Sequence, residues 1–196
     1  MTQRLILISG GIGSGKSAVG AALAARGMLV IDADSVGHEV LEPGTAAHAS
    51  VVGRWPEVVI GDVIDRRALG RIVFADPEEL AALEAITHPA IRRDIRARVE
   101  AAPRAGVAVE LPLLTNFLGE GWTRVVVDVP DEIRRERLRS RGLDQDEIAT
   151  RMAAQPSRDE WLAEADQVID NAGDLGALEA EIDRIVRLVL GDSSTA

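Results

Sequence analysis

The chain has 196 residues, of which 46% are hydrophobic and none is cysteine. This length and apolar content suit one compact domain with appended lobes, and the lack of cysteine excludes a disulfide scaffold or a thiolate metal site. The formal net charge of −10 argues against broad nucleic-acid binding, because that function needs a basic face.

Neither a membrane span nor a secretion signal is expected. The sequence has no run of about 18 apolar residues, the length that crosses a bilayer. Its first apolar run, at residues 4–9, begins too early to follow a cleaved signal. We therefore expect a cytoplasmic protein with no membrane partner.

The first predicted elements in chain order are a buried strand over residues 4–9 and a helix over residues 16–26. The segment that joins the strand to the helix and includes the first two helix residues matches the pattern G-x-x-x-x-G-K-[ST]. It reads Gly10-Gly-Ile-Gly-Ser-Gly-Lys-Ser17. In such a loop, glycines let backbone N–H groups curl around a polyphosphate, the lysine reaches the β/γ-phosphates and the hydroxyl ligates Mg²⁺. We predict that ATP binds Gly11, Ile12, Gly13, Ser14, Gly15, Lys16 and Ser17, and that Ser17 is the Mg²⁺ ligand.

Two acidic residues lie where the second predicted strand, residues 28–32, ends. Asp32 and Asp34 are two positions apart, and the carboxyl ends of parallel strands line the ligand crevice of an α/β sheet. One of these carboxylates can orient or deprotonate an acceptor hydroxyl, and we assign both to the acceptor site. The alternative is that one of them caps the helix that starts near Ser35.

A long helical insertion separates the second strand from the third. Residues 35–103 exceed a simple crossover. We predict five helices in this insertion, over residues 35–41, 45–53, 65–75, 77–87 and 89–102. Pro89 suits the first turn of the last of them. His88 has no partner at metal-ligand spacing, so we expect it to contact the acceptor or to make a structural hydrogen bond.

The third and fourth predicted strands cover residues 107–111 and 124–129. Glu110 ends the third strand, where a carboxylate can hold a Mg²⁺-bound water or contact the acceptor. The alternative is that Glu110 accepts a hydrogen bond from a neighbouring backbone or arginine.

Six arginines lie between residues 134 and 151, and the next helix is predicted over 131–141. We expect most of these arginines to be solvated or to pair with Glu132 and Glu136. Arg141 differs, because it ends the helix before Gly142 and a helical excursion over residues 142–165. There it can reach the transferred phosphate, so we assign it a catalytic role.

The last predicted strand and helix cover residues 167–170 and 174–190. Asn171 follows that strand, and we assign it to ATP binding, with an ordinary turn as the alternative. The tail, residues 191–196, is predicted to be disordered.

Together these elements predict an α/β fold of three layers, with a five-stranded parallel sheet in a P-loop nucleotide-binding core. We assign residues 1–34, 104–134 and 166–190 to this core. Residues 35–103 form the predicted helical acceptor-binding lobe, and residues 135–165 the predicted lid, which excludes water when it closes.

The sequence resembles the dephospho-CoA kinase family from Leu5 to about Leu190. Its motifs occur in a fixed order: Gly10-Gly-Ile-Gly-Ser-Gly-Lys-Ser17, Val30-Ile-Asp-Ala-Asp34, Val40-Leu-Glu-Pro-Gly44, Phe74-Ala-Asp-Pro-Glu78, Ile86-Thr-His-Pro-Ala-Ile91, Leu111-Pro-Leu-Leu114, Met152-Ala-Ala-Gln155 and Val168-Ile-Asp-Asn171. The loop alone is shared by many families, whereas the ordered set is far more specific.

This resemblance implies ATP-dependent phosphorylation of the ribose 3′-hydroxyl of dephospho-CoA, the last step of coenzyme A synthesis. It also implies a core, a helical CoA-binding lobe and a lid. Asp34 matches the acid that acts on the ribose hydroxyl, Arg141 the arginine on the lid side, and Lys16 with Ser17 the phosphate and Mg²⁺ groups.

The sequence departs from the family pattern at two places. The family usually has Asp where Glu110 stands, and the longer side chain changes the reach by about 1.5 Å. The family also has an acid soon after the Pro-Leu-Leu run, where this chain continues Thr115-Asn116.

Two other functions remain open from the sequence. One is another small-molecule P-loop kinase, for shikimate or a nucleoside monophosphate. The other is a regulator that binds ATP or CoA without turnover. We expect ATP and dephospho-CoA as ligands, with no nucleic acid and no obligate protein partner.

Overall fold

The computed structural model describes residues 4–102, 106–111 and 113–190. The chain divides into two compact units: the first joins the residues up to Ile31 with those from Ala102 onward, and the second covers Asp32–Ala101. The tail over residues 191–196, predicted to be disordered, lies outside the described residues.

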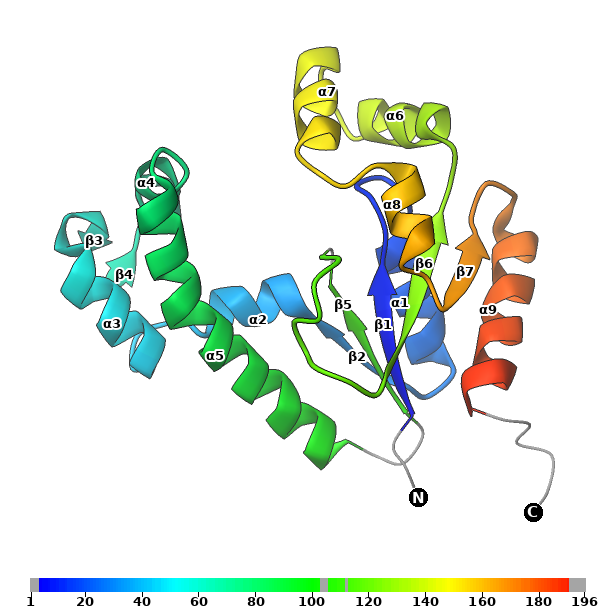
Figure 1. Ribbon diagram of the computed structural model, residues 1–196, viewed down its shortest axis with the longest axis horizontal. Coiled ribbons are helices and arrows are strands. Elements are labelled where there is room, and N and C mark those ends of the chain that lie inside the picture. Colours follow the sequence, from blue (N-terminus) through cyan, green and yellow to red (C-terminus); the bar gives the residue numbers. More distant parts are fainter. Residues whose placement is uncertain (1–3, 103–105, 112, 191–196) are drawn as a thin grey trace. The chain divides into compact units, whose positions relative to one another are not determined.

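A five-stranded sheet with the strand order β2-β5-β1-β6-β7 forms the centre of the first unit (Figure 1). Its strands are β1 (Leu5–Ser9), β2 (Leu29–Asp32), β5 (Val107–Glu110), β6 (Trp122–Asp128) and β7 (Gln167–Asp170). β1 pairs in parallel with β5 and β6, and β6 pairs in parallel with β7. The predicted α/β fold with a five-stranded parallel sheet is confirmed.

Helices α1 (Lys16–Ala25) and α9 (Leu175–Leu190) pack against one face of this sheet. Side chains alternate between the faces along a strand, so Ile6 and Ile8 point to the same side, where they pack with Leu23 and Ile182. Arg26 ties the two helices together at one end, since its guanidinium donates hydrogen bonds to Glu179 and Asp183.

Three further helices follow β6 in this unit: α6 (Asp131–Ser140), α7 (Gln145–Ala153) and α8 (Arg158–Ala163). α7 and α8 each begin with a capping box, in which Asp144 and Ser157 bond the backbone N–H groups of Glu147 and Glu160. α6 ends before Gly142, whose φ of 87° is the left-handed conformation that ends many helices.

The second unit is helical, with one small hairpin. Its elements are α2 (Ala33–Glu39), α3 (Ala46–Arg54), the 3₁₀ turn η1 (Pro56–Val58), β3 (Val59–Ile60), β4 (Val63–Ile64), α4 (Arg66–Val73) and α5 (Pro77–Ala101). It has a core of its own, in which Val51, Trp55 and Leu69 are buried together.

Two details of this unit differ from the prediction. The helices expected over 77–87 and 89–102 are one helix, α5, with Pro89 inside it. Proline removes one backbone hydrogen bond, but packing of Thr87, Ala90 and Ile95 into the interior supports both sides of the gap. The β3–β4 hairpin was not predicted, because two-residue strands carry too little periodicity to be recognised.

No helix in the part of the chain that the structure describes has both the length and the apolar character required to cross a membrane. The division of labour between an acceptor lobe at residues 35–103 and a lid at 135–165 concerns function and stays a prediction.

Candidate active site

The glycine-rich loop joins β1 to α1 and depends on glycine for its shape. Gly10, Gly13 and Gly15 have φ values of 135°, 80° and 100°, which L side chains rarely adopt. A Cβ atom at Gly10 would also lie 2.6 Å from the carbonyl oxygen of Val127. The loop therefore passes close to β6 in a conformation that other residues would strain.

The concave part of this loop offers free backbone donors. Gly15 is the N-cap of α1, with no capping side chain and no acidic residue in the first turn. Within the described residues, the N–H groups of Gly13, Gly15 and Ser17 donate no hydrogen bond. Unpaired donors at the positive end of a helix form an anion site, as the motif predicts.

Side chains from later elements bind the carbonyl groups of the same loop. The Ile12 carbonyl accepts from Arg134 Nε at 2.9 Å, and the Ser14 carbonyl accepts from Asn171 Nδ2 at 2.7 Å and Arg137 Nη1 at 3.1 Å. Arg134 is only 5% exposed and Asn171 only 6%. These bonds hold the loop in place from outside the anion site.

Arg134, which also pairs with Asp131 at 2.9 Å, and Arg137 bind the loop instead of facing solvent. The expectation that most of the six arginines are solvated or paired holds for the four exposed ones: Arg135, Arg139, Arg141 and Arg151. Arg139 also pairs with Glu136 at 2.8 Å. Arg134 and Arg137 lie on the same helix face as the buried Leu138, which was the signal in the sequence that this face points inward.

Lys16 and Ser17 open α1 beside the loop. Lys16 Nζ donates to the carbonyl oxygens of Gly10 at 3.1 Å and Gly11 at 3.3 Å. Ser17 Oγ donates to Glu110 Oε1 at 3.4 Å, which brings together two of the predicted site residues.

The Ser17 hydroxyl and the Glu110 carboxylate fit a Mg²⁺ ion. Mg²⁺ takes oxygen ligands and keeps several waters, so one or two protein oxygens beside a phosphate chain suffice. The described residues contain no group of three or more His, Cys, Asp or Glu side chains that could hold a metal ion.

A cavity of about 280 Å³ lies next to the start of α1. Gly15, Arg137, Arg141 and Asn171 all line it. The structure thus brings Arg141, the exposed residue after α6, into one wall with Asn171, which follows β7. Two predicted site residues that are 30 positions apart in the sequence share this cavity.

Arg124 organises the segment after β5. Its guanidinium donates to the carbonyl oxygens of Leu113, at 2.9 Å, and Leu114, at 3.3 Å, and to Ser9 Oγ at 3.3 Å. The hydrogen bonds from Arg124 to backbone carbonyl groups thus hold the segment from Leu113 to Thr115.

In the second unit, Asp32 at the end of β2 and Asp34 two residues later have different environments. Asp32 is the N-cap of α2: its carboxylate accepts from the Asp34 N–H at 3.0 Å and from Ser35 Oγ at 2.8 Å. This is the capping alternative, although it does not test a further role for Asp32. Asp34 is exposed, and its carboxylate has no partner among the described residues. His88 is half-buried within α5, next to Pro89.

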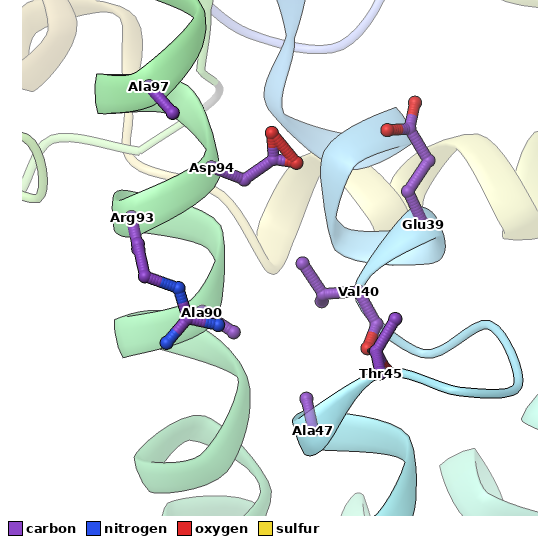
Figure 2. A pocket seen from close by; sticks show the side chains of 8 residues that line it. All are labelled: Glu39, Val40, Thr45, Ala47, Ala90, Arg93, Asp94 and Ala97. Atoms are coloured by element: carbon purple, nitrogen blue, oxygen red, sulfur yellow. The ribbon is translucent and has the colours of Figure 1, made fainter.

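The second unit also contains a cavity of about 540 Å³ between the α2–α3 segment and α5 (Figure 2). Its lining mixes small apolar and charged side chains: Glu39, Val40, Thr45, Ala47, Ala90, Arg93, Asp94 and Ala97. Arg98 bonds both acids of this lining, Asp94 at 2.7 Å and also Glu39, so one guanidinium is shared by two carboxylates. Hydrogen bonds to Asp94 and then Glu39 raise the pKa of Arg98 above its ordinary value.

Arg93 is the remaining cation of this cavity, and among the described residues it has no charged partner. With Glu39 and Asp94 paired to Arg98, the cavity presents Arg93 beside alanine and valine side chains. Arg93 and Arg98 together balance the charges of Glu39 and Asp94, and the apolar part of the lining suits a ligand with an apolar part.

Comparison with known proteins gives one consistent result. The family model described as dephospho-CoA kinase matches residues 4–176. The dephospho-CoA kinase of Frankia casuarinae is 47% identical over 91% of this chain and 80% of its own length. The dephospho-CoA kinase of Symbiobacterium thermophilum is 44% identical over 96% of this chain and 82% of its own length. The crystal structure of TT1252 from Thermus thermophilus superposes with a TM-score of 0.84 at 35% identity, covering 99% of this chain and 100% of that one.

Proposed function

The chain belongs to the dephospho-CoA kinase family, and we infer that it transfers the γ-phosphate of ATP to the ribose 3′-hydroxyl of dephospho-CoA, the last step of coenzyme A biosynthesis. The observation in the structure that best supports this reaction is the loop from Gly10 to Ser17. Its free N–H groups at the start of α1 suit a phosphate chain, and its single lysine lies beside them.

We propose that the first unit binds ATP. The phosphates occupy the loop, where Lys16 and the N–H groups of Gly13, Gly15 and Ser17 balance their charge. The cavity beside Gly15 has room for the nucleoside, with Arg141 and Asn171 in its wall. Arg141 then stabilises charge on the transferred group when the lid over residues 135–165 closes.

Mg²⁺ bound at Ser17, with Glu110 holding one of its waters, would neutralise part of the phosphate charge. The protein atoms set the rest of the geometry. We assign Asp34 the task of orienting the 3′-hydroxyl and accepting its proton, on the basis of the family resemblance and of its free, exposed carboxylate. A cytoplasmic location and the lack of an obligate protein partner are further predictions.

We propose that the second unit binds the acceptor, and that its cavity takes the flexible arm of dephospho-CoA. An Ala97→Phe substitution fills part of the cavity wall from an exposed position. We expect it to raise the KM for dephospho-CoA about tenfold, because the apolar ligand part loses its space, and to leave the KM for ATP unchanged.

The matched control is Ala81→Phe, an equally exposed alanine of α5 outside the cavity lining. It should leave both KM values unchanged. An unchanged KM for dephospho-CoA in Ala97→Phe would remove the acceptor from this cavity.

The function itself is tested by ATP consumption with and without dephospho-CoA and Mg²⁺, together with the mass of the product. Acceptor-dependent turnover that adds one phosphate is the expected result. Binding of both ligands without turnover would indicate a regulator, and turnover only with another acceptor would indicate another small-molecule kinase.

A further inference from the structure

Both polar groups of the Ile12 backbone are bound by side chains. The Ile12 N–H donates to Gln155 Oε1 at 2.7 Å, and the Ile12 carbonyl accepts from Arg134 Nε at 2.9 Å. Gln155 is half-buried and lies two residues after the end of α7, in the segment that leads to α8. A side chain 143 positions away in the sequence therefore contacts the middle of the phosphate loop.

The contact fixes more than one N–H group, because the peptide unit is planar and trans. The Ile12 N–H and the Gly11 carbonyl belong to the same peptide, so they point in opposite directions. With the N–H held by Gln155, the Gly11 carbonyl faces the other way, where it accepts from Lys16 Nζ at 3.3 Å and from the Ser14 N–H at 3.2 Å.

Without the contact, only the two hydrogen bonds to the Gly11 carbonyl would hold the orientation of this peptide. Gly11 has no side chain to restrict its backbone, so rotation of the Gly11–Ile12 peptide is sterically cheap. A turned peptide would take the Gly11 carbonyl away from Lys16 and present it to solvent or to the phosphates. A carbonyl oxygen near a phosphate is repulsive, since both carry negative charge.

Gln155 is itself held in place on its other side. Pro156 restricts Gln155 to extended backbone conformations. Two residues further on, Arg158 donates to both carboxylate oxygens of Asp128, the last residue of β6, at 2.8 and 2.6 Å. The segment from Gln155 to Arg158 is thus anchored to the sheet that carries the loop.

We propose that Gln155 is a positioning residue for the phosphoryl transfer, which locks the Gly11–Ile12 peptide in the orientation that keeps the Gly11 carbonyl on Lys16. This proposal rests on the proposed function of the loop in ATP binding. Gln155 joins the end of α7 to the loop, so the position of the predicted lid and the shape of the phosphate site depend on each other.

The test compares Gln155→Met, which keeps the length but replaces the amide oxygen with a weakly accepting thioether, with Gln145→Met, at an exposed glutamine at the start of α7. Calorimetry with ATP and Mg²⁺, without acceptor, measures the affinity. We expect a Kd about tenfold higher in Gln155→Met, since the freed N–H and the turned peptide both cost affinity. Gln145→Met should match the unsubstituted protein.

Steady-state kinetics distinguish positioning from a general loss of structure. In Gln155→Met the KM for ATP should rise and kcat should fall, while the KM for dephospho-CoA stays unchanged. Equal losses for both substrates, or an unchanged Kd for ATP, would overturn the proposal. If ATP binding responds as expected but no acceptor is phosphorylated even by the unsubstituted protein, the proposed function fails and the role of Gln155 in the loop stands.

Amide hydrogen exchange provides a second test. It needs neither a ligand nor the Gln155→Met variant. The Ile12 amide of the unsubstituted protein should exchange slowly, and so should that of Gln155→Glu, because a glutamate keeps an oxygen acceptor at the same reach. Fast exchange at Ile12 in both proteins would contradict the contact. Should Gln155→Met fail to fold, Gln155→Ala takes its place in the affinity and kinetic measurements, and the exchange of Ile12 tests the contact itself.

Discussion

Lys16 and Asp34 carry different parts of the proposed chemistry, one in each unit. Lys16 is the only lysine of the chain, so no neighbouring ammonium group can substitute for it. We expect Lys16→Ala to reduce kcat/KM by about 10²–10³-fold and to weaken ATP binding, because a preorganised cation is lost at the phosphates. Asp34→Ala should reduce kcat by about 10²–10⁴-fold with ATP affinity unchanged.

Circular dichroism and calorimetry check that both variants fold and separate their effects on binding. Asp34 is exposed and has no side-chain partner among the described residues, so its removal should cost only the small stabilisation, about 0.3–1 kcal/mol, of an acid in the first turn of α2. Near-normal turnover in either variant would exclude that residue from the mechanism.

The contact between Gly11 and Arg134 makes a second prediction at the residue scale. A Cβ atom at position 11 would lie 2.3 Å from Arg134 Nη2, on a guanidinium that is almost fully buried. We expect Gly11→Ala to lower the free energy of unfolding by about 1–3 kcal/mol, because the buried side chain must shift. Chemical denaturation measures the difference.

Gly53→Ala is the matched control, since no atom lies within 4 Å of its added Cβ and it sits inside α3. Alanine there should stabilise the protein by about 0.5–1 kcal/mol through helix propensity. A Gly11→Ala protein as stable as this control would show that the guanidinium moves freely.

The residues of the loop could be predicted from the sequence, whereas the residues that hold it could not. The pattern of Gly10, Gly15, Lys16 and Ser17 carries its own chemistry at fixed spacing. Gln155 acts through one hydrogen bond to a backbone 143 positions away, and no local pattern reports such a contact. Gln155 belongs to one of the motifs that carry the family resemblance, Met152-Ala-Ala-Gln155, but the motif does not indicate which atom Gln155 contacts.

At the scale of elements, the start of α8 gives a prediction that depends on pH. Hydrogen bonds from the Ser157 hydroxyl and then from its backbone N–H lower the pKa of Glu160 below its ordinary value of 4.5. A carboxylate with a lowered pKa stabilises the folded state above that ordinary value. This contribution is lost as the pH falls through the lowered pKa.

Ser157→Ala should therefore lower the melting temperature at pH 7 by about 2–4 °C, through the lost N-cap and the lost contact with Glu160. The difference from the unsubstituted protein should narrow below pH 4.5. Ser140→Ala is the control, because its hydroxyl donates to the Arg137 carbonyl and bonds no carboxylate among the described residues. Its effect should not change with pH, and a constant Ser157→Ala difference would contradict the prediction.

The elements themselves differ in how well the sequence predicts them. The five strands of the sheet and α1, α6 and α9 follow from apolar runs, the glycine loop and helix formers, because each pattern extends over several residues. The sequence predicts a helix break at Pro89, because proline disfavours a helix interior. The helix α5 is nevertheless continuous, since Thr87, Ala90 and Ile95 pack into the interior on both sides of Pro89. Tertiary packing decided that case against local preference.

At the scale of the whole molecule, the two units have separate hydrophobic cores, and this separation bears on the proposed division of function. Leu69 is 3% exposed in the core of the second unit, and Ile182 is fully buried between α9 and the sheet of the first. Truncating either side chain to alanine should cost about 2–5 kcal/mol of unfolding free energy.

The two truncations should differ in which ligand they affect. Because we assign ATP to the first unit, Ile182→Ala should weaken ATP binding as the melting temperature is approached, since α9 packs beside the helix that opens at the loop. Because we assign the acceptor to the second unit, Leu69→Ala should raise the KM for dephospho-CoA and leave the Kd for ATP unchanged. Calorimetry and kinetics on both variants, at a temperature where each is folded, measure these effects. If Leu69→Ala weakened ATP binding as much as Ile182→Ala, the nucleotide could not be assigned to the first unit alone, since a change in the core of the second unit would be altering its affinity.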